Sequence, residues 1–128
     1  MKILILGGAH QGKRAYASQT YGILPAAIAD AAALPVQQAL AGQAVSGLQC
    51  AVQALLEQGQ DPAAVIAQAL GSREDWLVIC DEVGAGIVPM EGEKRVWRDA
   101  VGRICTTLAA QADIVERVCC GLPQRLKG

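Results

Sequence analysis

The chain has 128 residues, a length typical of one domain that can bury a core, and we predict a single domain over residues 1–128. Its formal net charge is −1 and it contains no basic run, which argues against binding to nucleic acid or to an anionic membrane. No apolar run reaches transmembrane length, and residues 2–6 are too short for a signal peptide, so we expect a cytoplasmic protein.

A short aliphatic strand at residues 3–6 runs directly into a glycine-rich turn. Gly7, Gly12 and Lys13 have the GxxxxGK spacing of a phosphate-binding loop. In such a loop, backbone N–H groups and the N-terminus of the next helix hold an anion, and the lysine reaches the terminal phosphates. The alternative is a strand-to-helix turn without a ligand. The predicted nucleotide-binding residues are Gly7, Gly8, Ala9, His10, Gln11, Gly12, Lys13 and Arg14.

Two side chains of this loop raise separate questions. Arg14 stands where Ser or Thr normally gives Mg²⁺ a hydroxyl, so we expect weak Mg²⁺ dependence. His10 is the only histidine, and it could bond to a phosphate or a base, or simply face solvent. A nucleophilic role would need an orienting partner, and none is identifiable.

The first half of the chain continues with helical patterns. We predict a helix over residues 13–21, followed at residues 26–34 by a short strand or an Ala-rich helical turn, of which we favour the strand. Asp61 and Pro62 predict the capped start of a later helix, which Gly71 ends. Before Asp61, hydrophobic residues spaced three and four apart predict an amphipathic helix, with Val45, Leu48, Val52, Leu55 and Leu56 on one face.

The second half contains two clear strands and a long helix. Residues 76–80 read as a buried strand, and residues 113–120 read as a last strand. Between them, Glu91 opens a helix with Trp97, Val101, Ile104 and Leu108 on one face. Strands that alternate with helices predict an α/β fold with a mostly parallel sheet and helices on both faces. Ligands of such sheets bind at the carboxyl ends of the strands.

Asp81 and Glu82 follow the strand at residues 76–80 and would lie at that same end of the sheet. A carboxylate after an apolar strand is typical of a Walker B motif, which holds Mg²⁺ beside the phosphates. We therefore predict Lys13, Asp81 and Glu82 as catalytic residues and Asp81 as the metal ligand. The alternative for Asp81 is a helix or loop cap.

The five cysteines form no CxxC pair, and their number is odd. Cys80 lies in an apolar run, and Cys119 and Cys120 follow another. We expect buried, reduced thiols and no metal site built from cysteine and histidine, since His10 is the only histidine.

Several stretches resemble one known family. Residues 7–14, GGAHQGKR, resemble the GGARSGKS loop of the adenosylcobinamide kinase/adenosylcobinamide-phosphate guanylyltransferase family. Residues 81–89, DEVGAGIVP, are similar to its NEVGxGIVP, and residues 95–103, RVWRDAVGR, resemble its RxFRDxxGR. The C-terminal stretch also fits the family pattern, with A-x-x-A-D-x-V at residues 109–115 and G-x-P-x-x-L-K at residues 121–127.

The resemblance implies a P-loop nucleotide-binding fold and a role in cobalamin assembly. The family phosphorylates the aminopropanol hydroxyl of adenosylcobinamide with ATP or GTP, and then transfers GMP to that phosphate through a guanylylated histidine. Its members form oligomers through the sheet domain. The resemblance therefore implies a corrinoid substrate, ATP or GTP with Mg²⁺, and a homo-oligomer.

Three departures from the family pattern bear on activity. The middle of the chain is shorter, and it lacks the section that carries the guanylylated histidine. Arg14 replaces the loop serine, and Cys105 and Thr106 replace Asn and Gln on the long helix. We expect a nucleotide-dependent kinase without the guanylyl step. The alternatives are a non-catalytic nucleotide- or corrinoid-binding protein, or a nucleotidase with an unrelated substrate.

Overall fold

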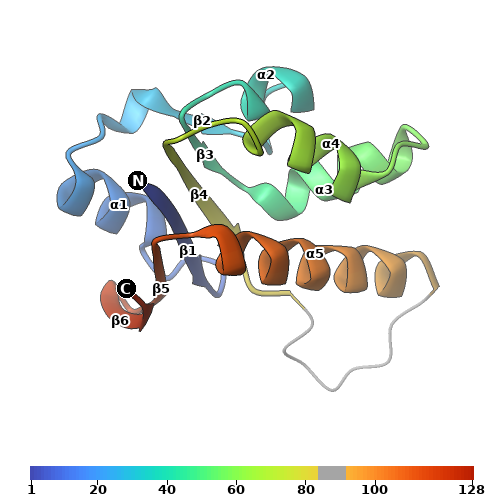
Figure 1. The fold of residues 1–128 in the computed structure, drawn as a ribbon. Helices are drawn as coiled ribbons and strands as arrows, with labels where there is room; N and C mark the ends of the chain where they lie inside the picture. The colour runs from blue at the N-terminus through green and yellow to red at the C-terminus, as the bar shows by residue number, and fades with distance from the viewer. Residues whose placement is uncertain (84–91) are drawn as a thin grey trace.

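The computed structural model describes residues 1–83 and 92–128, and it has the predicted α/β architecture (Figure 1). Six strands form one sheet, in which the first five in chain order are parallel and the last is antiparallel to its neighbour. In spatial order they are β2 (Ile28–Asp30), β3 (Ala44–Ser46), β4 (Trp76–Asp81), β1 (Lys2–Gly7), β5 (Ile114–Cys119) and β6 (Leu122–Lys127).

Helices cover both faces of this sheet, as predicted. One face packs against α1 (Lys13–Tyr21), which is followed by the short, exposed 3-10 turn η1 (Pro25–Ala27). The other face carries the larger core, and Figure 1 shows its helices grouped on the side of the sheet away from α1. These helices are α2 (Val36–Leu40), α3 (Leu48–Glu57), α4 (Pro62–Leu70) and α5 (Gly92–Gln111).

The central strands are buried on both faces, which explains their unbroken aliphatic sequences. In β1, Leu4 points into the larger core while Ile3 and Ile5 point towards α1, and none of the three is more than 6% exposed. Neighbouring β4 is buried from Trp76 to Cys80. The sheet therefore provides a rigid base for the loops at the carboxyl ends of its strands.

The prediction for Val45 was wrong. Val45 lies in β3, and α3 begins only at Leu48. Gly47 separates the two elements with a φ of +75°, a conformation that favours glycine and breaks the helical path. β3 has only three residues, all of them buried, because it runs between β2 and β4. The strand favoured within residues 26–34 exists, but it covers only Ile28–Asp30.

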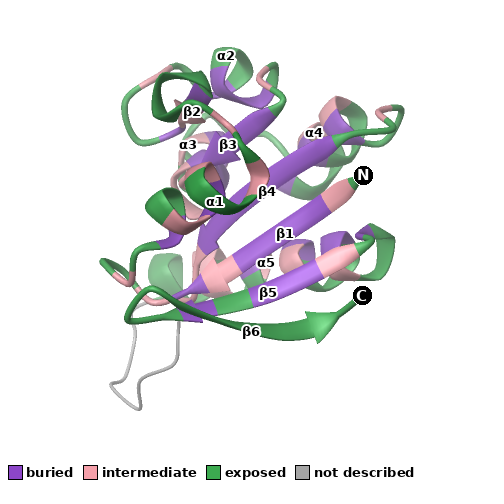
Figure 2. Cartoon of the chain, turned by 90° about the vertical axis from the view of Figure 1, so that its left-hand side faces the viewer, coloured by how far each residue is buried: buried purple, intermediate pink, exposed green. Residues whose placement is uncertain are grey.

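The C-terminal strand β6 was not predicted. After β5, a turn through Cys120 and Gly121, with φ values of +52° and +74°, reverses the chain into an antiparallel edge strand. Every residue of β6 is exposed, so it has no alternating apolar pattern to reveal it (Figure 2). The turn also exposes Cys119 and Cys120, contrary to the expected burial, whereas Cys80 is buried; all five cysteines are free thiols.

Other expected features are present. Asp61 caps α4 by accepting a hydrogen bond from the Ala63 N–H, with Pro62 at the first helical position. In α5, Val101, Ile104 and Leu108 are buried on one face. The expected helix start at Glu91 and most of the glycine-containing loop before it lie outside the described residues. Within residues 1–83 and 92–128, no helix has the length and apolarity needed to span a membrane.

Candidate phosphate-binding site

The carboxyl ends of four adjacent strands meet at one edge of the sheet. Gly7 ends β1, Asp81 ends β4, Ser46 ends β3 and Asp30 ends β2. Beside them, the loop at residues 9–15 completes a cavity of about 450 Å³. The cavity is lined by Ala9 to Ala15 and by Asp30, Ala32, Ser46, Gly47, Gln49, Ile79 and Asp81.

The loop between β1 and α1 depends on unusual backbone conformations. His10 and Gly12 both have positive φ values, +60° and +86°, and Gly12 is the N-cap residue of α1. At Gly7, a Cβ atom would clash with the carbonyl oxygen of Val118 on β5. The first glycine of the motif is therefore required by the close approach of two strands as well as by the turn.

Lys13 is the first residue of α1, and its side chain is only 6% exposed. Its Nζ donates to the Gly8 carbonyl oxygen at 2.6 Å and forms an ion pair with Asp81 Oδ1 at 2.7 Å. The lysine thus lies between the loop and the end of β4. An anion entering the cavity has to compete with Asp81 for this ammonium group.

Arg14 is exposed, but its guanidinium is held at the cavity wall. Its Nη1 donates to the Ser46 hydroxyl at 2.5 Å, and its Nη2 lies 3.5 Å from the Pro25 carbonyl oxygen. Ser46 is 4% exposed, so its hydroxyl is a fixed partner. Arg14 therefore adds a second cation at the cavity.

These residues fit a Mg²⁺ ion poorly. The Asp81 carboxylate is paired with Lys13, and a guanidinium takes the position of the usual loop hydroxyl. Across residues 1–83 and 92–128, no group of three His, Cys, Asp or Glu side chains has a metal-binding arrangement.

Gln11 fixes the back of the loop to the turn between β5 and β6. Its backbone carbonyl oxygen accepts from the Gly121 N–H at 2.8 Å, and its side-chain Oε1 accepts from the Cys120 N–H at 2.7 Å. The unpredicted hairpin therefore supports the predicted loop.

Gln49 plays a similar part on the other side of the cavity. Its Oε1 accepts from the Asp81 N–H at 3.0 Å, and its backbone oxygen accepts from Trp97 Nε1 at 2.8 Å. Trp97 packs against the larger core, as predicted. These bonds connect the end of β4, the start of α3 and the first turns of α5.

Asp30 is a second carboxylate in the cavity. Its Oδ1 accepts from the Ala32 N–H at 2.9 Å, and no Lys, Arg or His within residues 1–83 and 92–128 forms an ion pair with it. Burial raises the pKa of the nearby Cys50 thiol, and the negative charges of Asp30 and Asp81 raise it further. The negative charges of Asp30 and Asp81 are thus both close enough to influence Cys50, in the first turn of α3.

A buried carboxylate on β5 anchors α1 from the opposite side of the loop. Glu116 is 2% exposed and accepts hydrogen bonds from the hydroxyls of Tyr16, at 2.5 Å, and Tyr21. Arg125 on β6 lies 3.5 Å from the same carboxylate. Burial, followed by the bond to Glu116, raises the pKa of both tyrosines above its ordinary value.

The structure brings most of the predicted site residues together around the cavity, but not Glu82. His10 lines the cavity and is exposed, while Glu82 is directed away from it and pairs with Arg117 at 2.9 Å. Successive residues at a strand end point to opposite sides, which separates Glu82 from Asp81. The sequence reasoning missed the cavity residues Asp30, Ser46 and Gln49. Their signal was weak because β2 and β3 are only three residues long.

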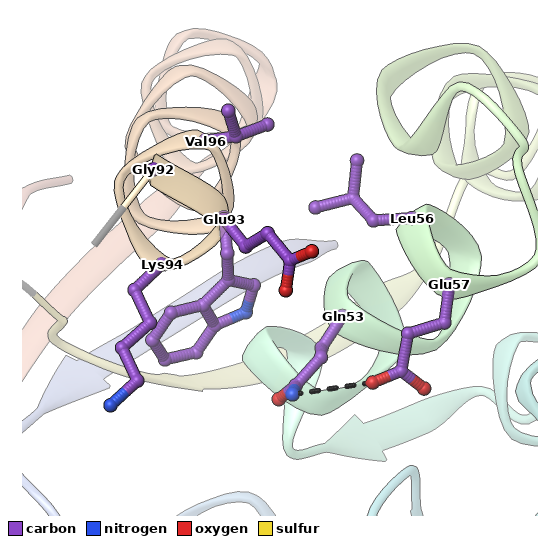
Figure 3. A pocket seen from close by; sticks show the side chains of 8 residues that line it. Gln53, Leu56, Glu57, Gly92, Glu93, Lys94 and Val96 are labelled. Carbon is purple, nitrogen blue, oxygen red and sulfur yellow. Dashed lines mark hydrogen bonds between the residues drawn. The ribbon is translucent and has the colours of Figure 1, made fainter. Parts of the chain in front are cut away.

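A second cavity lies apart from the loop, between α3 and α5 (Figure 3). It measures about 860 Å³ and shares none of the loop residues. Its wall includes two carboxylates, Glu57 and Glu93, with Leu56 and Val96 as apolar parts. Lys94 is the one cation among the described residues that line it, so the two carboxylates leave a net negative charge that disfavours phosphate.

Comparison with known proteins gives one family. The model of the cobinamide kinase / cobinamide phosphate guanyltransferase family matches residues 26–126. That range contains Asp30, Ser46 and Asp81 but begins after the glycine loop, so the loop geometry is independent support. A search of curated proteins found no significant match. Because the family model covers well over half of the sequence, the chain belongs to the cobinamide kinase / cobinamide phosphate guanyltransferase family, whose members are transferases with a P-loop type of fold.

Proposed function

We propose that this protein binds the phosphates of ATP or GTP at residues 7–14 and phosphorylates the aminopropanol hydroxyl of a cobinamide. The observation that carries the proposal is the position of Lys13. Its buried ammonium lies at the wall of an open cavity, between the glycine loop and Asp81. Phosphoryl transfer depends mainly on positioning and on charge stabilisation, and Lys13, Arg14 and the loop amides supply both.

The proposal does not include guanylyl transfer through histidine. His10 is the only histidine in the chain, and it lies in the loop that would hold the phosphates. A histidine covered by bound phosphates is poorly placed as a separate nucleophile. Incubation with α-labelled GTP tests this directly, and a stable label on His10 would contradict it.

We also propose that the protein forms a homo-oligomer, with a corrinoid as the small-molecule partner. The support for the oligomer is β6, an edge strand that is exposed along its whole length (Figure 2). Leu122 is 71% and Leu126 is 53% exposed. Unpaired strand edges are normally covered or protected. Sedimentation of the wild type and of Leu126→Lys measures the contribution of this edge.

A second candidate function is nucleotide binding without catalysis. It is favoured by the pairing of both loop cations within the chain, Lys13 with Asp81 and Arg14 with Ser46. A protein that only senses a nucleotide needs no metal and no open lysine. Turnover decides between the two functions.

The test combines binding and turnover. Titration with ATP and with GTP, each with Mg²⁺ and with EDTA, measures binding, and adenosylcobinamide with labelled ATP or GTP measures phosphoryl transfer. We expect binding of at least one triphosphate. If neither nucleotide binds, the proposed function is wrong; if binding occurs without transfer, the binding-only function stands.

A further inference from the structure

We propose that Asp30 is the general base that accepts the proton of the acceptor hydroxyl during phosphoryl transfer. This inference rests on the proposed function, because it assigns a role in the same site. Asp30 lies in the cavity formed by the phosphate loop, but on β2, three strands away from the loop strand β1.

The position of Asp30 along the sheet suits an acceptor. Strands in a sheet are about 4.8 Å apart, and the register places Asp30 level with Ile79, two residues before Asp81, so the Asp30 backbone lies about 12 Å from that of Asp81. In the proposed function, Lys13 at the ends of β1 and β4 binds the terminal phosphate there. The space between Asp30 and Asp81 is then open to the acceptor, next to the phosphate. An acceptor hydroxyl that enters there meets Asp30 on the side opposite the loop.

Asp30 also differs from Asp81 in its ion pairing. Asp81 is neutralised by Lys13 at 2.7 Å, whereas Asp30 forms no ion pair within the described part of the chain. One oxygen, Oδ1, accepts from the Ala32 N–H and fixes the carboxylate in place. The described residues provide no donor for the other oxygen, so it can accept a proton from a ligand.

The neighbouring residues leave room for this contact. Gly47 faces the carboxylate, and a Cβ atom added there would lie only 3.5 Å from Asp30 Oδ1. Ser46 is paired with Asp30 across β2 and β3, and its hydroxyl accepts a hydrogen bond from Arg14 Nη1 at 2.5 Å. The arrangement places a cation for the transferring phosphate next to a carboxylate for the acceptor.

The step balances as a simple displacement. The acceptor oxygen forms a bond to the terminal phosphorus of the nucleoside triphosphate, and the bond from that phosphorus to the bridging oxygen breaks. The nucleoside diphosphate leaves with the electron pair. The hydroxyl proton passes to Asp30, which later releases it to water.

The test is Asp30→Asn in the full chain. The amide oxygen of asparagine still accepts from the Ala32 N–H, so the turn after β2 is kept while the base is lost. The matched control is Asp61→Asn, because Asp61 accepts from the Ala63 N–H in the same local geometry at the start of α4 and does not line the cavity. Both variants are compared with the wild type for triphosphate affinity, melting temperature and transfer to adenosylcobinamide.

We expect Asp30→Asn to retain triphosphate affinity and melting temperature while transfer falls by about 100- to 10,000-fold, the usual contribution of a general base. Hydrolysis of the triphosphate by water should change less than transfer, and Asp30→Glu should recover part of the transfer. Asp61→Asn should transfer at the wild-type rate. Transfer by Asp30→Asn within about threefold of wild type, or a wild type that binds triphosphate without transferring it, would overturn the inference. Failure of the wild type to bind any triphosphate would overturn the proposed function and the inference with it.

Discussion

The ion pair between Lys13 and Asp81 gives the sharpest prediction for the binding site. Lys13→Ala removes the one buried ammonium group from the cavity wall and leaves Asp81 without its partner. A charge-assisted hydrogen bond contributes about 1.5–3 kcal/mol. Its loss should weaken triphosphate binding by about 10- to 150-fold. The remaining charge on Asp81 repels phosphate and acts in the same direction.

Asp81→Asn should have the opposite effect when no metal is present. In the wild type, Lys13 is held by Asp81 at 2.7 Å, and a phosphate has to displace this carboxylate. Asp81 is 31% exposed, so the ion pair contributes modestly, about 0.5–1 kcal/mol. Its removal should strengthen triphosphate binding in EDTA by about two- to fivefold.

Isothermal titration with a non-hydrolysable triphosphate in EDTA measures both variants and their double mutant. Lys127→Ala is the control for loss of a lysine, because Lys127 Nζ donates to the Ala109 and Ala110 carbonyl oxygens at the end of α5 and does not line the cavity. Wild-type affinity in a folded Lys13→Ala variant would refute the assignment of the loop. Weaker binding by Asp81→Asn in EDTA would show that the carboxylate assists the ligand and does not compete with it.

Three further predictions concern the loop cation and the buried carboxylate. Arg14→Ser should make triphosphate binding more dependent on Mg²⁺, because a hydroxyl replaces a guanidinium that repels a divalent cation; titration in Mg²⁺ and in EDTA checks this, and unchanged Mg²⁺ dependence would contradict it. Glu116→Gln should lower the free energy of unfolding by about 1–3 kcal/mol in urea, since buried hydrogen bonds to a carboxylate are weakened, whereas exposed Glu57→Gln should have little effect. The pKa values of Tyr16 and Tyr21 are raised in the folded state. The stability that these hydroxyls contribute is therefore complete below the ordinary tyrosine pKa of about 10 and is lost as the pH rises above it. Unfolding in urea should be easier at about pH 11 than at about pH 9, and Tyr21→Phe should reduce this difference.

The glycine loop could be predicted from the sequence because its signal is local. Three residues, Gly7, Gly12 and Lys13, describe a strand, a tight turn and a helix start in direct succession. Each requirement acts over a few residues of backbone, and none depends on distant contacts. The long helix α5 and the strand β4 were similarly clear, because burial imposes a pattern over many residues.

The remainder of the site depends on contacts that short elements do not encode. β2 and β3 have three residues each, too few for a period, and Val45 therefore followed the helical spacing of its neighbours in the prediction. As a result Asp30 and Ser46 were not recognised at the strand ends. The position of Glu82 was predictable in principle, because alternation at the end of β4 sends it towards Arg117 when Asp81 faces the cavity.

The two cations of the loop differ in what an incoming anion has to displace. Lys13 is paired with a carboxylate, so a phosphate gains this charge only by competing with Asp81. Arg14 is bonded to a neutral hydroxyl and to a backbone oxygen, so its charge acts on the cavity without such competition. We expect Arg14 to attract the anion first and Lys13 to join once the phosphate reaches the loop. Substitution of Asp81 and of Arg14 should therefore change metal-free affinity in opposite directions, an increase for Asp81→Asn and a decrease for Arg14→Ser.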